Sequence, residues 1–224
     1  MAQRLRTDQI NNVVVIGLGR FGSSVADALV RLGHNVLALD VDLSLVQQWS
    51  DRLTHVVQAS CIDADTLRSL GVQEFPHAVV AIGTDIEASA LTVLALAEIG
   101  VPDIWAKAVT ENHGRILERI GAHHVIFPEA AMGERVAHLV TSRMMDFIEF
   151  DDGFAIVKMR APQEAVGRAL ADSQLRARFG VTVIGVKRPR QDFVYARPET
   201  MVEPGDLLIV CGKTHIVEQF AAQA

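Results

Sequence analysis

The chain has little of what marks secreted, membrane-spanning or nucleic-acid-binding proteins. Its 224 residues include two cysteines, Cys61 and Cys211, which lie far apart and outside any Cys-x-x-Cys motif. This excludes a disulfide scaffold and a cysteine zinc site and favours a reducing compartment. No apolar run is long enough to cross a bilayer, and residues 1–12 lack the apolar core of a signal peptide. Lysine and arginine (21) are outnumbered by aspartate and glutamate (27), so we expect a soluble protein without a nucleic-acid partner.

What the chain does have is a nucleotide-fold pattern in residues 13–42. Val13–Ile16 predicts a buried strand and leads into GLGRFG at 17–22; an apolar-periodic helix follows, and a second strand, Val36–Leu39, ends at Asp40. This order is the fingerprint of a dinucleotide-type site, in which the glycines let backbone approach phosphate and the acid accepts hydrogen bonds from ribose hydroxyls. Asp40 also argues against a 2′-phosphate, and hence against NADP.

Arg20 is the unusual residue of this loop. A pyrophosphate needs only backbone N–H groups, whereas a guanidinium suits a more highly charged terminal phosphate because it can bind it in a planar, bidentate manner. The alternative is an exposed arginine on the first helical turn, where the helix dipole disfavours a cation. The sequence therefore favours a phosphate contact at Arg20.

The order of strands and helices predicts the fold class. Strand-like runs alternate with helical ones at Val13–Ile16, Val36–Leu39, His55–Gln58, Ala78–Ile82, Ile104–Ala108 and His124–Phe127. Such alternation predicts βαβ units and an α/β fold, here a Rossmann-type doubly wound parallel sheet of six strands. Thr84 with Glu87 indicates a capping box before the helix expected at 88–99.

We expect three segments: a nucleotide-binding lobe at 1–130, a crossover helix and hinge at 131–150, and a small α+β lobe at 151–224. The crossover helix, expected at 130–145, belongs to no βαβ unit, so its apolar face is covered either by the lobe itself or by a second subunit. In the C-terminal lobe the pattern predicts strands at 154–159, 181–186, 193–196 and 207–210 and helices at 164–178 and 213–220. We interpret the basic stretch Lys187–Arg190 as a solvated loop at a turn.

Further motifs, taken together with this loop, resemble the RCK (also KTN) family of regulatory proteins. They are ALDVD at 38–42, VVAIGTDIEAS at 79–89, IWAKA at 104–108, IFPEAAMG at 126–133, RARFGVTVIGVKR at 176–188 and PGDLLIV at 204–210. The resemblance covers almost the whole chain, and within the family it is greatest to the cytoplasmic subunits of Ktr-type, Trk-like potassium transporters.

The resemblance implies a non-enzymatic gating subunit in the cytoplasm, held at the plasma membrane by a membrane-embedded potassium channel or transporter subunit. It also implies a homodimer that assembles into an octameric ring, with ATP and ADP competing for the first lobe and ATP favouring the conducting state. In some relatives the C-terminal lobe binds cyclic di-AMP. Here Leu175, Arg176, Phe179, Gly180 and Val183 occupy that region, although the same pattern is typical of an amphipathic helix end.

Carried over residue by residue, the resemblance places the nucleotide contacts as follows. The phosphates meet Gly19, Arg20, Phe21 and Gly22, and Gly17 permits the tight turn of this loop. The ribose meets Asp40, with Val41 and Asp42 beside it, and Ser60 and Cys61 flank the adenine. Ile82, Gly83 and Thr84 form the floor, and the further contacts to the nucleotide are Gly17, Lys107, Ala108, Val109, His113 and Glu129. Glu129 resembles the carboxylate that helps hold a cation, divalent or sodium, beside the phosphates. The segment ASCID at 59–63 departs from the asparagine- or glycine-led segment of close relatives, so we expect a weaker or reversed polar contact to adenine.

Some of these residues have a plainer interpretation. His113 could simply occupy the first turn of its helix, and Glu129, directly after Pro128, is favourable there from the helix dipole alone. Cys61 suits a small packing residue better than a reactive thiol. Lysine inside a strand seldom helps packing, so Lys107 favours a functional role.

A rival function is a small NAD-dependent oxidoreductase or an NAD(H)-sensing regulator built on the same loop. An oxidoreductase needs an acid–base group facing the nicotinamide, and residues 151–224 offer a single histidine, His215, with no evident dyad or metal motif. A nucleotide-sensing transcription factor would need a helix-turn-helix segment and a basic face, which the sequence lacks. The residues favour a non-catalytic regulator that binds ATP or ADP, with NAD(H) as the alternative ligand.

Overall fold

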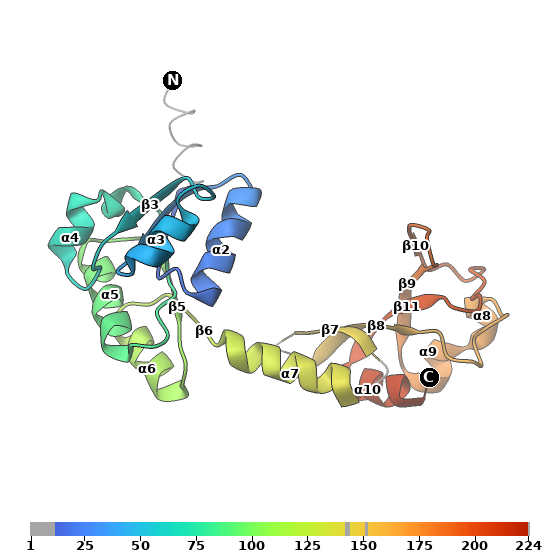
Figure 1. Ribbon diagram of the computed structural model, residues 1–224. Helices are drawn as coiled ribbons and strands as arrows, with labels where there is room; N and C mark the ends of the chain where they lie inside the picture. The colour runs from blue at the N-terminus through green and yellow to red at the C-terminus, as the bar shows by residue number, and fades with distance from the viewer. Residues whose placement is uncertain (1–11, 142–143, 151, 224) are drawn as a thin grey trace, which may run out of the picture. The chain divides into compact units, whose positions relative to one another are not determined.

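The computed structural model describes residues 12–141, 144–150 and 152–223, and the chain divides into two compact units, Met1–Glu129 and Ala130–Ala224 (Figure 1). Among the described residues no helix is both long and apolar enough to span a bilayer. Each unit is built around its own sheet and its own hydrophobic core.

The first unit alternates strands and helices along the chain. In order these are β1 (Asn12–Ile16), α2 (Arg20–Arg31), β2 (Asn35–Asp40), α3 (Leu43–Trp49), β3 (His55–Gln58), α4 (Ala64–Ser69), the 3-10 turn η1 (Val72–Glu74), β4 (His77–Val80), α5 (Ile86–Glu98), β5 (Asp103–Lys107), α6 (Glu111–Arg119) and β6 (His124–Ile126). The six strands pair in parallel in the order β3-β2-β1-β4-β5-β6. This order confirms the predicted doubly wound, Rossmann-type sheet.

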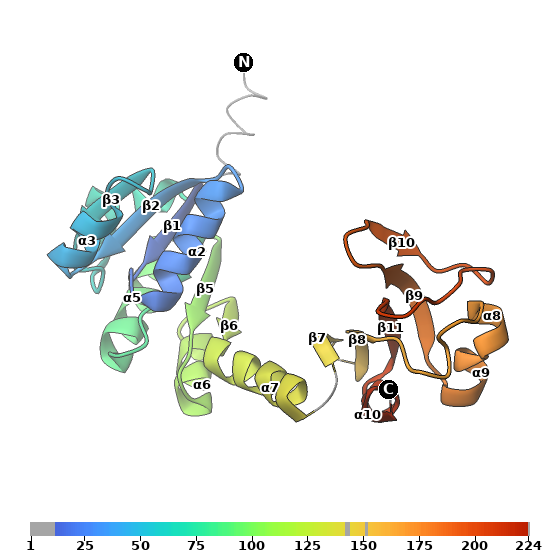
Figure 2. The same cartoon turned by 45° about the vertical axis from the view of Figure 1, so that its right-hand side comes forward.

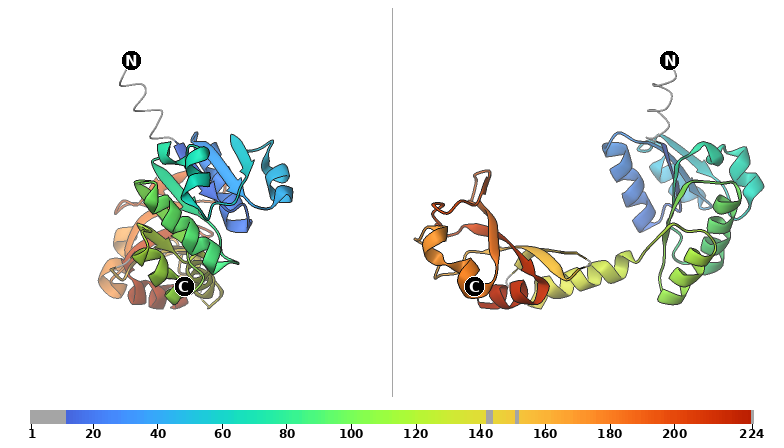
Figure 3. Two further views of the ribbon diagram at one scale, coloured as in Figure 1. Left: turned by 90° about the vertical axis from the view of Figure 1, so that its left-hand side faces the viewer. Right: turned by 180° about the vertical axis from the view of Figure 1, so that it is seen from behind.

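Strict alternation of side chains along β1 explains why both faces of this sheet are covered. Val14 and Ile16 belong to one core, which also contains residues of α4, α5 and α6. Val13 and Val15 belong to a second core with residues of α2 and α3. Because successive strand residues point to opposite faces, one continuous apolar strand supplies both cores. Helices flank this sheet on both of its faces (Figures 1 and 3).

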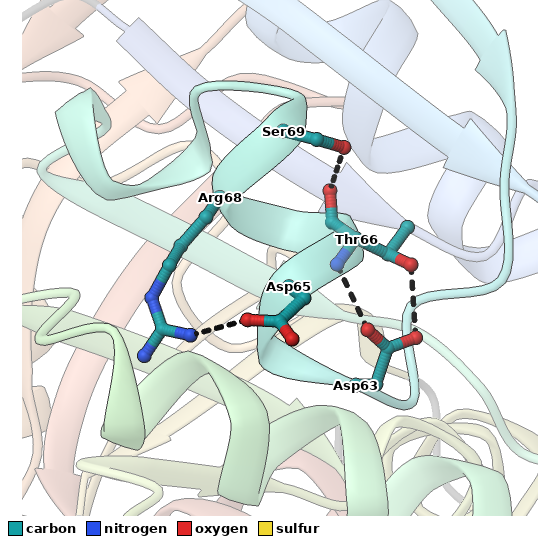
Figure 4. Close-up of polar contacts among 5 residues, drawn as sticks. All are labelled: Asp63, Asp65, Thr66, Arg68 and Ser69. Carbon is teal, nitrogen blue, oxygen red and sulfur yellow. Dashed lines mark hydrogen bonds and ion pairs between the residues drawn. The ribbon is translucent and has the colours of Figure 1, made fainter.

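Side-chain caps begin four helices of this unit, and α4 is an example (Figure 4). The Asp63 carboxylate accepts hydrogen bonds from the backbone N–H and the hydroxyl of Thr66, at 2.8 and 2.9 Å. Asp65 and Arg68 form an ion pair one turn apart on the same short helix. Asp42, Asp85 and Thr110 cap α3, α5 and α6 in the same way. Such caps satisfy N–H groups that the first helical turn leaves without partners.

The cap of α5 differs from the sequence prediction. Asp85, rather than Thr84, accepts the hydrogen bond from the backbone N–H of Ala88, at 2.9 Å. The predicted Thr84–Glu87 capping box was therefore wrong by one residue. Aspartate is as good a cap as threonine, and either choice leaves α5 starting within one turn of the same place.

The second unit forms an antiparallel sheet with helices. Its elements are α7 (Pro128–Thr141), β7 (Met144–Phe150), β8 (Phe154–Arg160), α8 (Leu170–Ser173), α9 (Leu175–Phe179), β9 (Thr182–Lys187), β10 (Phe193–Tyr195), β11 (Leu207–Lys213) and α10 (Thr214–Gln223). The strands pair in the order β10-β9-β11-β8-β7, so β10 and β7 are the edges (Figure 2). A small α+β lobe with an antiparallel sheet confirms the predicted class of the C-terminal region.

Two stretches of this unit differ from the sequence prediction. The crossover helix ends at Thr141 and not at 145, and most of the expected hinge is strand β7, paired with β8. In place of the helix expected at 164–178, residues 164–167 form turns, and only α8 and α9 are helical. These two helices are separate because Gln174 between them adopts a left-handed backbone conformation with φ of 50°. Apolar spacing alone could not reveal that break, since it depends on one backbone angle.

The apolar face of α7 is only partly covered by its own chain. Leu139 packs against the core of the second unit, with residues of β8, β9, β11 and α10. Met132, Val136 and Val140 are 54%, 47% and 78% exposed. The described residues of the lobe therefore cover only part of the apolar face of α7, and a second subunit remains the other candidate to cover the rest.

Candidate functional site

A cavity of about 700 Å³ lies at the carboxyl ends of the central strands of the first unit. It is lined by Ile16, Gly17, Gly19, Arg20, Phe21, Leu39, Asp40, Val41, Ala59, Ser60, Cys61, Ile62, Ala81, Ile82, Gly83, Thr84, Asp85, Ala88, Thr92, Lys107, Val109 and Glu129. The strand order reverses between β1 and β4, which is the place where doubly wound sheets bind ligands. The volume is in the range of small-molecule sites.

Two glycines shape the loop at the mouth of this cavity. Gly17 has a φ of +96°, a conformation that suits glycine, and its N–H donates to the Leu39 carbonyl at 2.8 Å. Gly22 lies so close beneath the loop that an added Cβ would be 1.8 Å from the Gly17 oxygen. Gly22 therefore lets α2 pack against the loop, although it does not line the cavity itself.

Helix α2 begins at the cavity without a side-chain cap. Its N-cap residue is Gly19, and its first turn contains no acidic residue. By contrast, α3, α4, α5 and α6 of the same unit all have capping side chains. The N–H groups of the first turn of α2, with the positive end of the helix dipole, are therefore available for an anion. The exposed Arg20 at this point adds a further positive charge.

Asp40 joins the end of β2 to the glycine loop. One carboxylate oxygen accepts a hydrogen bond from the Leu18 N–H at 2.5 Å, and the other accepts one from the Asp42 N–H at 2.8 Å. A carboxylate can accept about four hydrogen bonds, so two positions stay open to ribose hydroxyls. The structure thus adds a role that the sequence did not suggest: Asp40 also holds the loop in place.

Lys107 and Glu129 form an ion pair on the wall of the cavity nearest α7. The lysine is 9% exposed, and its ammonium group lies 5.7 Å from the centre of the Phe21 ring. The hydrogen bond from Lys107, together with the Lys107 and Arg20 charges, lowers the pKa of Glu129. Glu129 is therefore ionised and can accept either a lysine or a metal cation.

Cys61 borders the cavity with its thiol buried. Desolvation, with smaller contributions from the Asp40 and Asp63 carboxylates, raises the pKa of the Cys61 thiol to about 12. The thiol is therefore protonated at neutral pH and is a poor nucleophile, as expected of a packing residue. Ser60 beside it is exposed and can present a hydroxyl to a ligand.

Four of the predicted contacts do not line the cavity: Gly22, Asp42, Ala108 and His113. Asp42 instead caps α3, where hydrogen bonds from Ser44 lower the pKa of its carboxyl. Ala108 is packed in the core, and His113 is fully buried at the first turn of α6. These placements favour supporting roles, and direct contact of these residues with a ligand stays a prediction.

Several residues that line the cavity were not predicted from the sequence; they are Ile16, Leu39, Ala59, Ile62, Ala81, Asp85, Ala88 and Thr92. Ile16, Leu39, Ala59 and Ala81 each lie within one residue of the carboxyl end of a strand. The general rule that ligands bind at the carboxyl ends of parallel strands could have found these four. Ala88 and Thr92, one helical turn apart on α5, needed the tertiary structure.

The buried His113 predicts a pH dependence of stability. Its Nδ1 faces the Val109 N–H at 3.4 Å, and its Nε2 has no hydrogen-bond partner among the described residues. Desolvation lowers the pKa of His113 from 6.5. The neutral form of His113 is therefore favoured in the folded state. Its contribution to the free energy of unfolding is fully present above pH 6.5. It decreases as the pH falls, because His113 is protonated in the unfolded chain before it is protonated in the folded one.

We expect urea unfolding of the wild type to show a steeper loss of stability from pH 7 to pH 5.5 than His113→Leu, by up to about 1.4 kcal/mol per pH unit. His215→Leu, at the start of α10, is the control because it lies outside this unit. Equal slopes in the wild type and His113→Leu would show that His113 titrates normally.

A second group of potential metal ligands lies outside this cavity, in the second unit. Glu134, His138 and Glu149 each place one ligand atom within 4.8 Å of the others. His138 also forms an ion pair with Glu218, at 2.9 Å from its Nδ1. The metal contact predicted from sequence, Glu129, is not part of this group.

The comparisons with known proteins agree with this geometry. The family model of the TrkA-N domain matches residues 13–128, and that of the TrkA-C domain matches residues 154–224. The Ktr system potassium uptake protein A of Bacillus subtilis (strain 168) is 36% identical over 207 residues, 92% of this chain and 93% of that protein. Protein C of the same system and organism is 36% identical over 207 residues, 92% of this chain and 94% of that protein.

Solved structures share the fold at lower identity. The GsuK RCK domain has a TM-score of 0.66 and 18% identity, covering 95% of this chain and 47% of that one. The GsuK channel bound to NAD also has a TM-score of 0.66 and 18% identity, covering 100% of this chain and 43% of that one. The chain therefore spans less than half the length of these structures, and the likeness shows the fold.

Proposed function

Because the chain belongs to the family of proteins built from a TrkA-N and a TrkA-C domain, we propose that it is a cytoplasmic, non-enzymatic subunit that regulates a membrane-embedded potassium transporter. Its ligand is an adenine nucleotide bound in the cavity of the first unit. The observation that carries this proposal is that the uncapped start of α2 and the cationic side chains of Arg20 and Lys107 all border the same cavity. The relatives at 36% identity, both potassium uptake proteins, support the assignment to potassium transport.

Arg20 is the residue proposed to distinguish ATP from ADP. A third phosphate adds charge at the mouth of the loop, where the guanidinium can form charge-assisted hydrogen bonds. Each such bond contributes on the order of 1.5–3 kcal/mol when it is desolvated. A difference in affinity of this size can shift an equilibrium between two conformations of the subunit by about ten-fold or more.

Helix α7 supports the proposed homodimer. Met132, Val136 and Val140 lie along this helix and are each about half exposed or more. A second copy of the chain could cover these residues, and four such dimers would make the octameric ring that the family resemblance implied. That the C-terminal lobe binds a cyclic dinucleotide stays a prediction. Of the residues considered for that ligand, Leu175 is buried in the core and Phe179 packs on Phe220, so the exposed polar side chain among them is that of Arg176.

We expect Arg20→Gln to weaken ATP binding about ten-fold and ADP binding by clearly less, because the side chain meets the terminal phosphate. Isothermal titration calorimetry against ATP, ADP, NAD and NADH measures both effects and ranks the ligands. Arg31→Gln is the matched control, since Arg31 lies on the same helix but pairs with Asp27. Equal losses for ATP and ADP would remove Arg20 from the terminal phosphate, and tight NADH with no response to ATP would favour the NAD(H)-sensing alternative.

Glu129 is proposed to help hold a cation, divalent or sodium, beside the phosphates, in exchange for its contact with Lys107. Glu129→Gln should therefore reduce the dependence of ATP binding on magnesium, because the amide keeps the shape but loses the charge. The measurement is the ratio of ATP affinities with and without magnesium. Glu118→Gln, on the exposed side of α6 and outside both the cavity and the second group of potential metal ligands, is the control. An unchanged ratio would leave Glu129 with its helix-start and lysine-pairing roles.

A further inference from the structure

The second unit contains a hollow of about 310 Å³ that the proposed function does not use. It is lined by Met145, Lys158, Arg160, Lys187, Arg188, Pro189, Arg190, Gly205 and Leu207. Five of these nine side chains are cationic, although the chain as a whole has a net charge of −6. The positive charge is therefore a local feature of this hollow, not part of a generally basic surface.

The sheet explains how residues distant in the sequence meet here. Arg160 of β8 pairs with Leu207 of β11, and Leu207 pairs with Lys187 of β9, so the three lie side by side across three strands. Lys158 is two residues before Arg160 and therefore points to the same face. The basic loop after β9, expected to be merely solvated, thus adds its charges to two cations on another strand.

The turn after β9 is held in a defined conformation. Lys187 donates to the carbonyl of Gln191, and the Gln191 N–H donates to the carbonyl of Arg188 at 3.3 Å. Arg190 has a φ of 61°, an uncommon value for a residue with a side chain. Arg188 and Arg190 are therefore presented by an ordered turn.

The acidic groups around the hollow neutralise only part of its charge. Arg188 forms ion pairs with Glu203 at 3.1 Å and Asp206 at 3.6 Å. Asp146 is opposite Lys158 in the sheet register, but its carboxylate pairs with Arg135. Within the described part of the chain, Lys158, Arg160 and Arg190 form no ion pair with a carboxylate. Like charges this close repel one another, and an anion between them relieves the repulsion.

We propose that this hollow is an anion site that binds a phosphate-bearing compound. Arginine favours phosphate because its planar fork matches two phosphate oxygens. The apolar surface of Met145, Pro189 and Leu207 fits an organic portion attached to the phosphate, and the volume is at the small end of ligand sites. The site lies at the Lys187 end of β9, whereas the region considered for cyclic di-AMP lies at its Thr182 end.

The test is calorimetric titration of the full-length protein with pyrophosphate. The wild type should bind at two independent sites per chain, one in the first unit and one in this hollow. Lys158→Gln and Arg190→Gln should each weaken the second site about ten-fold, since each removes one charge-assisted contact. Lys213→Gln, the same charge change at the far end of β11, should bind like the wild type. Arg190 lies in an exposed turn, so this variant keeps the test valid if Lys158→Gln is unstable.

Sedimentation with vesicles separates two sources of the phosphate group. Binding to phosphatidylglycerol but not to phosphatidylcholine vesicles, lost in Lys158→Gln and Arg190→Gln, assigns the site to a lipid headgroup. Pyrophosphate binding that depends on the same two residues, without vesicle binding, assigns it to a free phosphorylated compound. The proposal is overturned if neither ligand responds to these residues, or if Lys213→Gln causes an equal loss. The response of the second site to Lys158→Gln and Arg190→Gln does not depend on nucleotide binding in the first unit.

Discussion

Replacing Gly22 with alanine should destabilise the first unit by about 3 kcal/mol and abolish nucleotide binding. A Cβ at this position would lie 1.8 Å from the Gly17 oxygen and 2.8 Å from the Ala81 side chain. Overpacking usually costs about 1–3 kcal/mol, and the upper end applies here because the nearest neighbour is backbone. The loop and the start of α2 would have to separate, which would misplace the N–H groups that face the cavity.

The control for this substitution is Gly19→Ala in the same loop. Gly19 has ordinary backbone angles, φ −61° and ψ −175°, and a Cβ there meets nothing within 4 Å. In urea unfolding, Gly19→Ala should therefore have nearly the stability of the wild type. In titration it should bind nucleotide more weakly, because the added Cβ would contact the phosphates. Wild-type stability of Gly22→Ala would mean that α2 does not pack on the loop as described.

Leu96→Ala and Leu208→Ala should each cost about 3–4 kcal/mol, but in different parts of the molecule. Leu96 of α5 and Leu208 of β11 are both completely buried, and each belongs to the core of one unit. Truncating a buried leucine removes apolar contact and leaves a cavity, which gives losses of this size. Since the two cores share no residue, each substitution should weaken one unit and spare the other.

Two measurements follow the units separately. Calorimetric unfolding should show one transition lowered by Leu96→Ala and a different one lowered by Leu208→Ala. At a temperature at which the second unit of the Leu208→Ala variant is unfolded, titration should still show nucleotide binding to the first unit. A single transition that both substitutions lower equally would mean that the units unfold together and that the proposed domain division has no thermodynamic meaning.

Local sequence patterns were reliable where one physical cause dominates. The apolar runs at Val13–Ile16 and Val36–Leu39 predicted strands because burial on both faces of a parallel sheet demands continuous apolar residues. The patterns failed where distant contacts decide. Apolar residues at 144–150 suit a helix or a strand, and pairing with β8 selects the strand.

The family resemblance drawn from seven short motifs is confirmed by the domain matches over both halves of the chain. For the site, most of the carried-over residues do line one cavity. Two of those that do not are Asp42, which is the last residue of the ALDVD motif but caps α3, and His113, which lies five residues after the IWAKA motif but is fully buried. Proximity along the chain cannot tell these outcomes apart, because the direction of a side chain depends on the next element.

The sequence by itself determined the parallel sheet, the glycine loop and the charge at its mouth, because strand burial and turn geometry are set by neighbouring residues. Only the tertiary structure decided that Asp40 holds the loop, that Lys107 meets Glu129, and that Lys158 and Arg160 join the basic turn after β9. Each of these contacts joins residues from separate elements. They form only when the register and packing of whole strands bring those elements together, and no local sequence pattern specifies which residues of separate elements will meet.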